Sequence, residues 1–258
     1  MQSKLALLFD SGLGGTIIYS TAKKLIPDCC FYYVSDGKNF PYGNLDDCNL
    51  KQNSLTLILA KAKEIKPDVI VVACNTASTL ILDDLRLQCD IPVVGVVPAI
   101  KTASNITSVN KITLLATPAT IKRDYTHQLV KSFAHQSQVQ LLGSSDLAQL
   151  AESKLLYNRF DKNRLLSILS SIDTESDVVV LGCTHFSFLI DEIRDFLNKD
   201  VLVIDSTLAI ANRIKFLLSN KSLSVTHSKV DTFYNTKTIQ PELHKYVASI
   251  GFDNIIMS

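Results

Sequence analysis

The stretch Asp68-Val-Ile-Val-Val-Ala-Cys74-Asn-Thr-Ala-Ser78-Thr-Leu80 has a near copy further along the chain, Asp177-Val-Val-Val-Leu-Gly-Cys183-Thr-His-Phe-Ser187-Phe-Leu189. In both, an uninterrupted apolar run ends at a cysteine. Such runs are typical of central parallel strands that helices cover on both faces. Internal repeats indicate repeated architecture, and open α/β sheets bind ligands at the carboxyl ends of their strands. The repeat therefore predicts two similar halves, each with one thiol at a ligand-binding edge.

Short aliphatic runs alternate with amphipathic stretches along most of the chain. This alternation is typical of parallel α/β layers. The predicted fold class is α/β, with two pseudo-symmetric doubly wound domains, mainly parallel sheets and an interdomain cleft. The expected strands lie at 4–9, 30–35, 68–73, 92–96, 111–116, 138–142, 177–182 and 201–204.

The length of 258 residues allows two domains of roughly 100 to 150 residues each. The segment Val94–Ser108, with Pro98 and several small residues, is the best candidate for a first crossing between them, and a second is expected near Ser206. We therefore expect a discontinuous N-terminal domain and an inserted second domain. The first comprises residues 1–97 plus 208–258 and carries Asp10 and Cys74; the second comprises residues 98–207 and carries Glu152, Cys183 and His185.

The charge balance bears on the kind of partner. With 26 basic and 25 acidic residues, the net charge of +1 gives no reason to expect a nucleic acid or an anionic membrane as partner. No apolar run approaches the ~18 residues of a spanning helix, and the run from Leu5 to Phe9 ends at Asp10 before it could form a signal-peptide core. We expect a soluble cytoplasmic protein that binds a small polar molecule.

The chain contains six cysteines, and without an export signal we expect them to be reduced. No metal site is expected, because Cys183 and His185 could supply two ligands but nothing obvious completes the set. Four of the cysteines lack the context of a strand end followed by polar residues. We interpret these as packing residues: Cys29, Cys30, Cys48 and Cys89.

Cys74 and Cys183 are the leading candidates for chemistry. A strand-to-helix junction places a thiol beside unpaired backbone amides, which lower its pKa from about 8.5 and favour a thiolate base. A single buried cysteine often only fills space, but two at equivalent repeat positions favour a function. His185 is placed to tune or relay a proton of Cys183. Asn75, Thr76 and Thr184 are expected to cap the helices that follow.

The run Asp10-Ser11-Gly12-Leu13-Gly14-Gly15 resembles a phosphate-binding loop. Ile17 stands where a dinucleotide fingerprint needs its third glycine, although Asp36 partly matches the ribose-binding acid, so nucleotide binding stays open as a weaker alternative. In a second interpretation the glycines let backbone amides hold a carboxylate, while Asp10 acts as an acid, base or amine partner. In a third, Asp10 is only a helix cap.

Four motifs in order resemble the signature set of bacterial glutamate racemase. The resemblance runs from Leu5 to about Ala211, and although each motif is weak alone, the ordered set is specific. The motifs are Asp10-Ser11-Gly-Leu-Gly-Gly, Pro41-Tyr42-Gly43, Ala73-Cys74-Asn75-Thr76-Ala77-Ser78 and Leu181-Gly182-Cys183-Thr184-His185-Phe186, accompanied by Thr117-Pro-Ala-Thr120 with Tyr125, by Glu152, and by Val203-Ile-Asp205-Ser206.

The resemblance implies a cofactor-independent interconversion of L- and D-glutamate that supplies D-glutamate for peptidoglycan. The implied partner is glutamate, and we expect a homodimer. Cys74 would take the α-proton of D-glutamate and Cys183 that of L-glutamate, from opposite faces. Asp10 and His185 would assist the two thiols, with Glu152 as a third helper. The residues implied to hold the substrate's ammonium and carboxylates are Asp10, Ser11, Pro41, Tyr42, Gly43, Asn75, Thr76, Thr117, Thr120 and Thr184.

Other functions stay open beside this one. A racemase for aspartate, another carbon-acid enzyme of the same superfamily, or a non-catalytic ligand-binding module would suit the same fold, since fold does not fix function. A pyridoxal-dependent racemase is less favoured, because no lysine stands at a strand end. The chain departs from the family pattern at Val97-Pro98, at Ser144-Ser145 and at Asn44-Leu45-Asp46. The first two departures lie outside the signature motifs and concern the domain interface, regulation and oligomer geometry.

Overall fold

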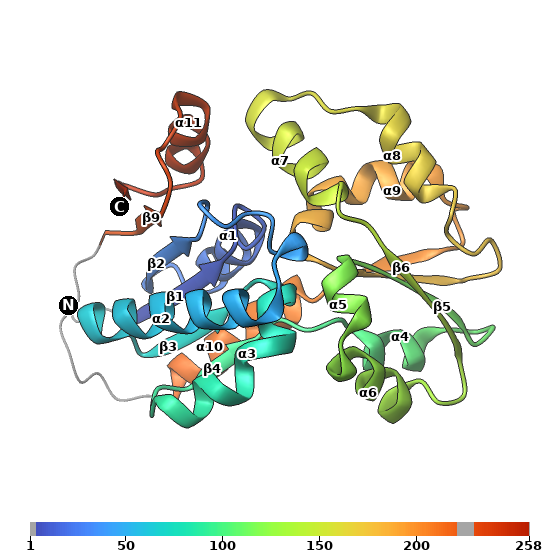
Figure 1. Ribbon diagram of the computed structural model, residues 1–258, viewed down its shortest axis with the longest axis horizontal. Coiled ribbons are helices and arrows are strands. Elements are labelled where there is room, and N and C mark those ends of the chain that lie inside the picture. The colour runs from blue at the N-terminus through green and yellow to red at the C-terminus, as the bar shows by residue number, and fades with distance from the viewer. Residues whose placement is uncertain (1–3, 221–229, 258) are drawn as a thin grey trace.

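The computed structural model describes residues 4–220 and 230–257 and contains two sheets whose strands are all parallel (Figure 1). The six-stranded sheet has the order β10-β9-β2-β1-β3-β4, with β1 at Leu5–Asp10, β2 at Cys30–Ser35, β3 at Val69–Val72, β4 at Val93–Gly95, β9 at Thr232–Asn235 and β10 at Asn254–Met257. The four-stranded sheet has the order β6-β5-β7-β8, with β5 at Lys111–Ala116, β6 at Gln138–Gly143, β7 at Val178–Gly182 and β8 at Leu202–Ile204.

The two sheets repeat one topology. The order β2-β1-β3-β4 in the first matches β6-β5-β7-β8 in the second, so β3 and β7 occupy equivalent places. Cys183 directly follows β7, and Cys74 follows β3 after one residue, Ala73. The predicted α/β class with pseudo-symmetric, doubly wound halves is therefore confirmed. We call the six-stranded sheet with its helices the first lobe, and the four-stranded sheet with its helices the second lobe.

Helices cover both faces of the first sheet, because its central strands are apolar on both sides. Along β1, Ala6 and Leu8 face one core with α1 and α10, whereas Leu7 and Phe9 face another with α2 and α3. The helices of this lobe are α1 at Thr16–Leu25, α2 at Asp47–Ile65, α3 at Asn75–Gln88, α10 at Thr207–Ser219 and α11 at Pro241–Ser249, with a short 3-10 helix, η1, at Tyr42–Asn44.

The second sheet is covered in the same way. Leu115 of β5 belongs to a core with α7, α8 and α9, while Ile112 and Leu114 face a second core on the side of α4 and α6. The bounds are α4 at Ile100–Ile106, α5 at Pro118–Lys122, α6 at Asp124–Phe133, α7 at Leu147–Tyr157, α8 at Lys162–Leu169 and α9 at Ile190–Phe196, with a 3-10 helix, η2, at Thr184–Leu189.

The chain passes between the lobes twice, from β4 to α4 and from β8 to α10. The two crossings touch, since the Ser206 hydroxyl donates a hydrogen bond of 2.7 Å to the carbonyl of Val97. We propose that the lobes divide at these crossings, as 1–97 plus 208–258 and 98–207. Residues 1–3, 221–229 and 258 of the first of these units lie outside the described residues.

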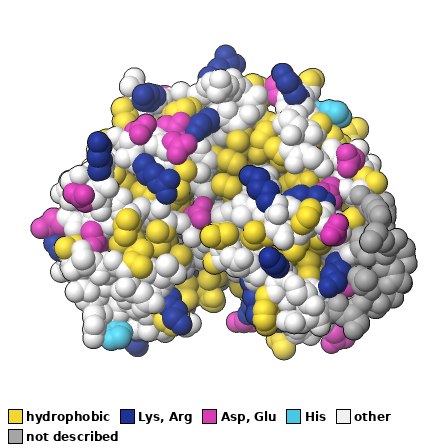
Figure 2. Space-filling model, turned by 180° about the vertical axis from the view of Figure 1, so that it is seen from behind, with side chains coloured by type: hydrophobic (Ala, Val, Ile, Leu, Met, Phe, Trp, Pro, Cys, Tyr) yellow, Lys and Arg dark blue, Asp and Glu magenta, His cyan; other side chains and the backbone are white. Residues whose placement is uncertain are grey.

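Two strands of the first sheet, β9 and β10, were not among the expected strands. Each has four residues, and β10 lies at the edge of the sheet with most of its residues exposed, so neither presents an extended apolar run. A space-filling view shows the molecule hollowed between its two halves (Figure 2). No helix within the described ranges is long and apolar enough to cross a membrane.

Candidate active site

The residues singled out from sequence come together where the two lobes meet. Asp10 ends β1, and Cys74, Thr117 and Cys183 follow β3, β5 and β7. The carboxyl ends of parallel strands share one edge of a sheet, which is where such folds place their ligands. Side chains from one lobe contact those of the other at this edge, as the hydrogen bonds described next show.

Cys74 is buried, and its thiol donates to the Ser11 hydroxyl at 3.7 Å. Burial, followed by the charge of Asp10, raises the pKa of the Cys74 thiol to about 12. A hydrogen bond from the Ala77 amide and the Ser11 contact lower it only in part. The expectation that the pKa of Cys74 is lowered overall is therefore wrong, because desolvation of the thiolate outweighs the effect of the helix amides. The raised pKa favours the thiol form of Cys74 at neutral pH.

Asp10 is fully buried beside this thiol. Its Oδ1 accepts a hydrogen bond of 2.9 Å from the Gly12 amide, and its Oδ2 accepts one of 3.1 Å from the Thr184 hydroxyl of the second lobe. Burial raises the pKa of the Asp10 carboxyl, while His185, Gly12 and Thr184 counteract part of the rise. The charge of Asp10 thus acts on the Cys74 thiol, while its carboxyl group accepts a hydrogen bond from Thr184, the residue after Cys183.

Cys183 has a basic neighbour. Its Sγ lies 4.0 Å from Nδ1 of His185, and both side chains are buried. Burial alone lowers the pKa of the imidazole, but the contacts with Cys183 and Glu152 outweigh it and hold the His185 pKa well above its usual range. A protonated imidazole at this distance stabilises a thiolate.

The other ring nitrogen of His185 has two neighbours. Nε2 lies 3.0 Å from Oε1 of Glu152 and 3.1 Å from the Gly14 amide nitrogen. A ring nitrogen donates or accepts but does not do both at once. The raised pKa favours the protonated ring, in which Nε2 donates to Glu152. Glu152, on α7, also accepts a hydrogen bond of 2.9 Å from the Leu13 amide, so it is part of the site and not a solvated helix residue.

The glycine-rich turn serves contact between the lobes. A Cβ on Gly12 would lie 2.4 Å from Oε1 of Glu152, and one on Gly14 would lie 2.5 Å from both Nδ1 of His185 and Oγ1 of Thr184. The Gly12 amide donates to Asp10 and the Leu13 amide to Glu152, while the Gly14 amide nitrogen lies 3.1 Å from Nε2 of His185. The protein's own side chains therefore lie against the amides that the phosphate and carboxylate interpretations require for a ligand.

Asp36, considered above as a ribose-binding acid, instead accepts hydrogen bonds from side chains of the protein. Its Oδ2 accepts a hydrogen bond of 2.6 Å from the Tyr42 hydroxyl, and its Oδ1 accepts one of 2.8 Å from Thr236. This buried carboxylate fixes Tyr42 in the Pro41–Gly43 segment. Gly43 then lies against the second lobe, where an added Cβ would be 3.2 Å from Cβ of Thr117.

Three threonine hydroxyls from the two lobes form one cluster, which we call the threonine cluster. Thr76 of α3 lies 2.9 Å from Thr117 and 3.4 Å from Thr120, and Thr117 lies 2.9 Å from Thr120, measured between Oγ1 atoms. Nearby in sequence, the amide nitrogen Nδ2 of Asn75 is buried without a hydrogen-bond partner in the structure. Buried polar groups of this kind are usually paired, so Asn75 is suited to receive a ligand oxygen.

The predicted capping residues take other positions. Cys74 and Cys183 themselves are the cap residues of α3 and η2, with no side-chain capping bond. Asn75 and Thr76 belong to the first turn of α3, and Thr184 begins η2. Asp10 does not cap α1, because Gly15 is its cap residue. The predictions that these side chains act as caps are wrong, which leaves their polar atoms for other contacts.

The remaining cysteines differ in exposure. Cys29 and Cys30 are buried and Cys89 is partly buried, whereas Cys48, in the first turn of α2, is exposed and does not serve packing. All six cysteines are free thiols. Across residues 4–220 and 230–257, no three His, Cys, Asp or Glu side chains are grouped so that they could hold a metal ion.

Sequence reasoning missed Arg123, which lies between α5 and α6 and borders a cavity of about 620 Å³ between the lobes. The lining residues are Gly43, Leu45, Asp46, Asp47, Thr79, Leu80, Pro118, Ala119, Lys122, Arg123, Asp124 and Tyr125. Arg123 closely follows Thr117-Pro-Ala-Thr120, and that proximity was the only signal for it in the sequence.

This arrangement of two buried thiols, each with its own acid–base partner at the junction of two like lobes, is the kind of site that serves proton transfer to and from a bound carbon acid. Residues 19–214 match the family model described as Asp/Glu/Hydantoin racemase. The chain is 43% identical over 252 residues to the glutamate racemase of Shewanella halifaxensis, covering 96% of this chain and 95% of that protein. It is 45% identical over 240 residues to that of Aliivibrio fischeri, covering 93% and 91%.

Among solved structures, the glutamate racemase of Escherichia coli, in complex with L-glutamate and the activator UDP-MurNAc-ala, matches with a TM-score of 0.92 and 35% identity. The match covers 99% of this chain and 98% of that one. The chain therefore belongs to the Asp/Glu/hydantoin racemase family, and within it to the glutamate racemases.

Proposed function

We propose that this protein racemises glutamate without a cofactor, by proton transfer at Cys74 and Cys183. The observation that carries the proposal is the placement of these two thiols after equivalent strands of two like lobes, with the charge of Asp10 acting on Cys74 and the ring of His185 in contact with Cys183. Membership of the glutamate racemases supports the choice of substrate.

In the direction from L- to D-glutamate, Cys183 acts as the thiolate. It takes the α-proton and becomes a thiol, and the electron pair of the broken C–H bond passes into the substrate carboxylate. Cys74 then donates its thiol proton to the opposite face of the α-carbon and is left as a thiolate. The high pKa of Cys74 suits it to begin this direction protonated.

The reverse direction uses the same groups with their roles exchanged. The Cys74 thiolate takes the proton of D-glutamate and Cys183 donates. The two thiols have unlike helpers: Asp10 lies close to Cys74, whereas His185 contacts Cys183 and is in turn held by Glu152. The scaffold repeats, but the surroundings of the two bases do not.

The substrate-holding groups in this proposal are mostly neutral. Hydroxyls and amides bind carboxylates without adding a base that competes for the α-proton. We assign this role to Ser11, Asn75, Thr184 and the threonine cluster, and we assign the shaping of the site to Pro41, Tyr42 and Gly43. Asp10 is the acidic group suited to the substrate's ammonium.

We further propose that the enzyme supplies D-glutamate for peptidoglycan, that it works in the cytoplasm and that it forms a homodimer. Sedimentation of the purified protein tests the last point directly, since a dimer and a monomer of 28.5 kDa differ twofold in mass.

The activity is tested by following the optical rotation of pure L- and pure D-glutamate with purified protein and no added cofactor. We expect both to lose rotation. Cys74→Ser and Cys183→Ser should each abolish this, whereas Cys48→Ser, at an exposed thiol, should not. A panel with aspartate separates the related racemase activity. Unchanged rotation of glutamate with the wild-type protein would contradict the proposal.

A further inference from the structure

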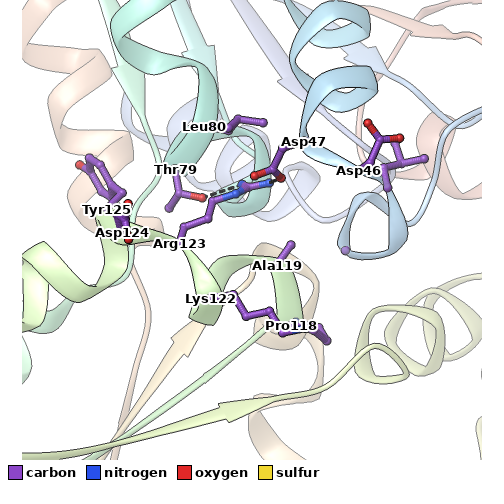
Figure 3. Close-up of a pocket in the computed structure, with 12 residues that line it drawn as sticks. Asp46, Asp47, Thr79, Leu80, Pro118, Ala119, Lys122, Arg123, Asp124 and Tyr125 are labelled. Atoms are coloured by element: carbon purple, nitrogen blue, oxygen red, sulfur yellow. Dashed lines mark hydrogen bonds and ion pairs between the residues drawn. The ribbon is translucent and has the colours of Figure 1, made fainter.

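Arg123 connects the lobes next to the threonine cluster, through its contact with Thr76. The residue belongs to the second lobe, at the junction of α5 and α6, and its side chain is almost fully buried. Its guanidinium reaches the first lobe (Figure 3). There Nη1 donates to the carbonyl of Thr76 and, at 2.9 Å, to the hydroxyl of Thr79, while Nη2 pairs with Asp47 at 2.6 Å.

These contacts reach the N-terminal parts of two helices, α2 and α3. Thr76 is the shared element, because its carbonyl accepts from Arg123 while its hydroxyl belongs to the threonine cluster. The other two hydroxyls of the cluster, those of Thr117 and Thr120, come from α5 and its cap, the segment that leads into Arg123. One short segment of the second lobe therefore contacts Thr76 from two sides.

We propose that Arg123 is a positioning residue that fixes Thr76 against Thr117 and Thr120, and so sets the geometry with which the two lobes hold the substrate. The inference rests on the proposed racemase activity. A planar guanidinium suits this task because it contacts a carbonyl, a hydroxyl and a carboxylate at fixed angles, which a lysine ammonium does not.

The surroundings of Arg123 argue against a purely stabilising ion pair. Asp47 is more than half exposed, and an exposed partner contributes little to stability. The Nε of Arg123 is buried without a hydrogen-bond partner in the structure. Burying an unpaired N–H group costs free energy. The burial of this guanidinium is therefore better explained by its hydrogen bonds to α3 than by its ion pair with Asp47.

The test compares Arg123→Gln with Arg164→Gln. The control removes an exposed arginine that pairs with Asp146 inside the second lobe and does not join the lobes. We expect Arg123→Gln to raise KM for both enantiomers of glutamate about tenfold and to change kcat less than about threefold, because looser positioning weakens ground-state and transition-state binding alike. Arg164→Gln should leave both constants as in the wild type.

Arg123→Lys keeps the charge, guards against loss of folding and should give an intermediate KM. Asp47→Asn should raise KM by less than Arg123→Gln, and the double variant should resemble Arg123→Gln alone, since the two side chains act in one network. A KM for Arg123→Gln equal to that of Arg164→Gln, with an active wild type, would overturn the Arg123 assignment. An inactive wild type would instead contradict the racemase proposal.

Discussion

The Thr184 hydroxyl, which follows Cys183 in the second lobe, donates a hydrogen bond of 3.1 Å to the carboxylate of Asp10 in the first lobe. Asp10 is also the residue whose charge acts most strongly on Cys74. A single hydrogen bond therefore links Asp10, which acts on Cys74, to Thr184, the residue next to Cys183. Separating the lobes would break this link, so this part of the site depends on the contact between them.

Replacing Asp10 by Asn should stabilise the protein while reducing its activity. Burial raises the folded-state pKa of this carboxyl above its unfolded value. Its contribution to stability is therefore full below the unfolded pKa and is lost as pH rises through the folded pKa. At pH 8 we expect Asp10→Asn to raise the free energy of unfolding by on the order of 1 kcal/mol, with a smaller gain at pH 5.

Urea denaturation at the two pH values measures this difference. Asp46→Asn is the matched control of opposite sign. A hydrogen bond from the Asn49 amide lowers the pKa of Asp46, so the Asp46 carboxylate contributes to stability at neutral pH and this contribution is lost as pH falls. A loss of stability in Asp10→Asn that is equal at both pH values would contradict the assignment.

Cys74 should resist alkylation at neutral pH. Its pKa of about 12 leaves little thiolate, the form that reacts. Iodoacetamide labelling followed by peptide mass spectrometry should show Cys74 reacting at least about tenfold more slowly than the exposed Cys48 at pH 7, with a rate that keeps rising at alkaline pH. Equal labelling of the two cysteines at pH 7 would show that the Cys74 thiol is not shielded.

Glu152→Gln should lower the pKa of His185. Both the hydrogen bond and the charge of Glu152 raise that pKa, and an amide supplies no negative charge. An NMR titration of the His185 ring measures the change, and kcat should fall about tenfold. Glu192→Gln is the control, since Glu192 of α9 pairs with Lys154 of α7, the helix that carries Glu152, and not with His185. An unchanged His185 pKa in Glu152→Gln would refute this role.

Gly14→Ala should impair the contact between the lobes. The added methyl group would lie 2.5 Å from atoms of both Thr184 and His185. We expect kcat/KM to fall about a hundredfold, because small displacements of catalytic groups are costly. Gly43→Ala, whose Cβ would meet Thr117 at 3.2 Å, should have a weaker effect. Wild-type kcat/KM in Gly14→Ala would mean that the turn is not needed for this close approach.

Much of the fold could be predicted because its signals are local. The apolar runs before Cys74 and Cys183 marked central strands, and their likeness gave the repeated topology. The strands β9 and β10 could not be found in this way. Polar residues end β9 and most of β10 is exposed, and β9 pairs with the distant β2 while β10 pairs with β9.

The site was predictable where chemistry coincides with a motif and not where it depends on burial. The sequence placed Cys74 beside helix amides but could not show how far the thiol is buried, so the sign of its pKa shift was wrong. Arg123 went unnoticed because its partners, Asp47 and Thr76, are remote in sequence and belong to the other lobe. The glycine turn was recognised, but its purpose depends on side chains of the second lobe.

The central claim is that two thiols act on opposite faces of the α-carbon. The most direct test follows the incorporation of solvent hydrogen at that carbon. L-Glutamate is incubated with the enzyme in heavy water, and the reaction is stopped early. NMR should find deuterium at the α-carbon of the D-glutamate formed, while the recovered L-glutamate keeps its original hydrogen, because one thiol removes and the other supplies. Deuterium appearing as fast in recovered L-glutamate as in the product would indicate a single base and contradict the account.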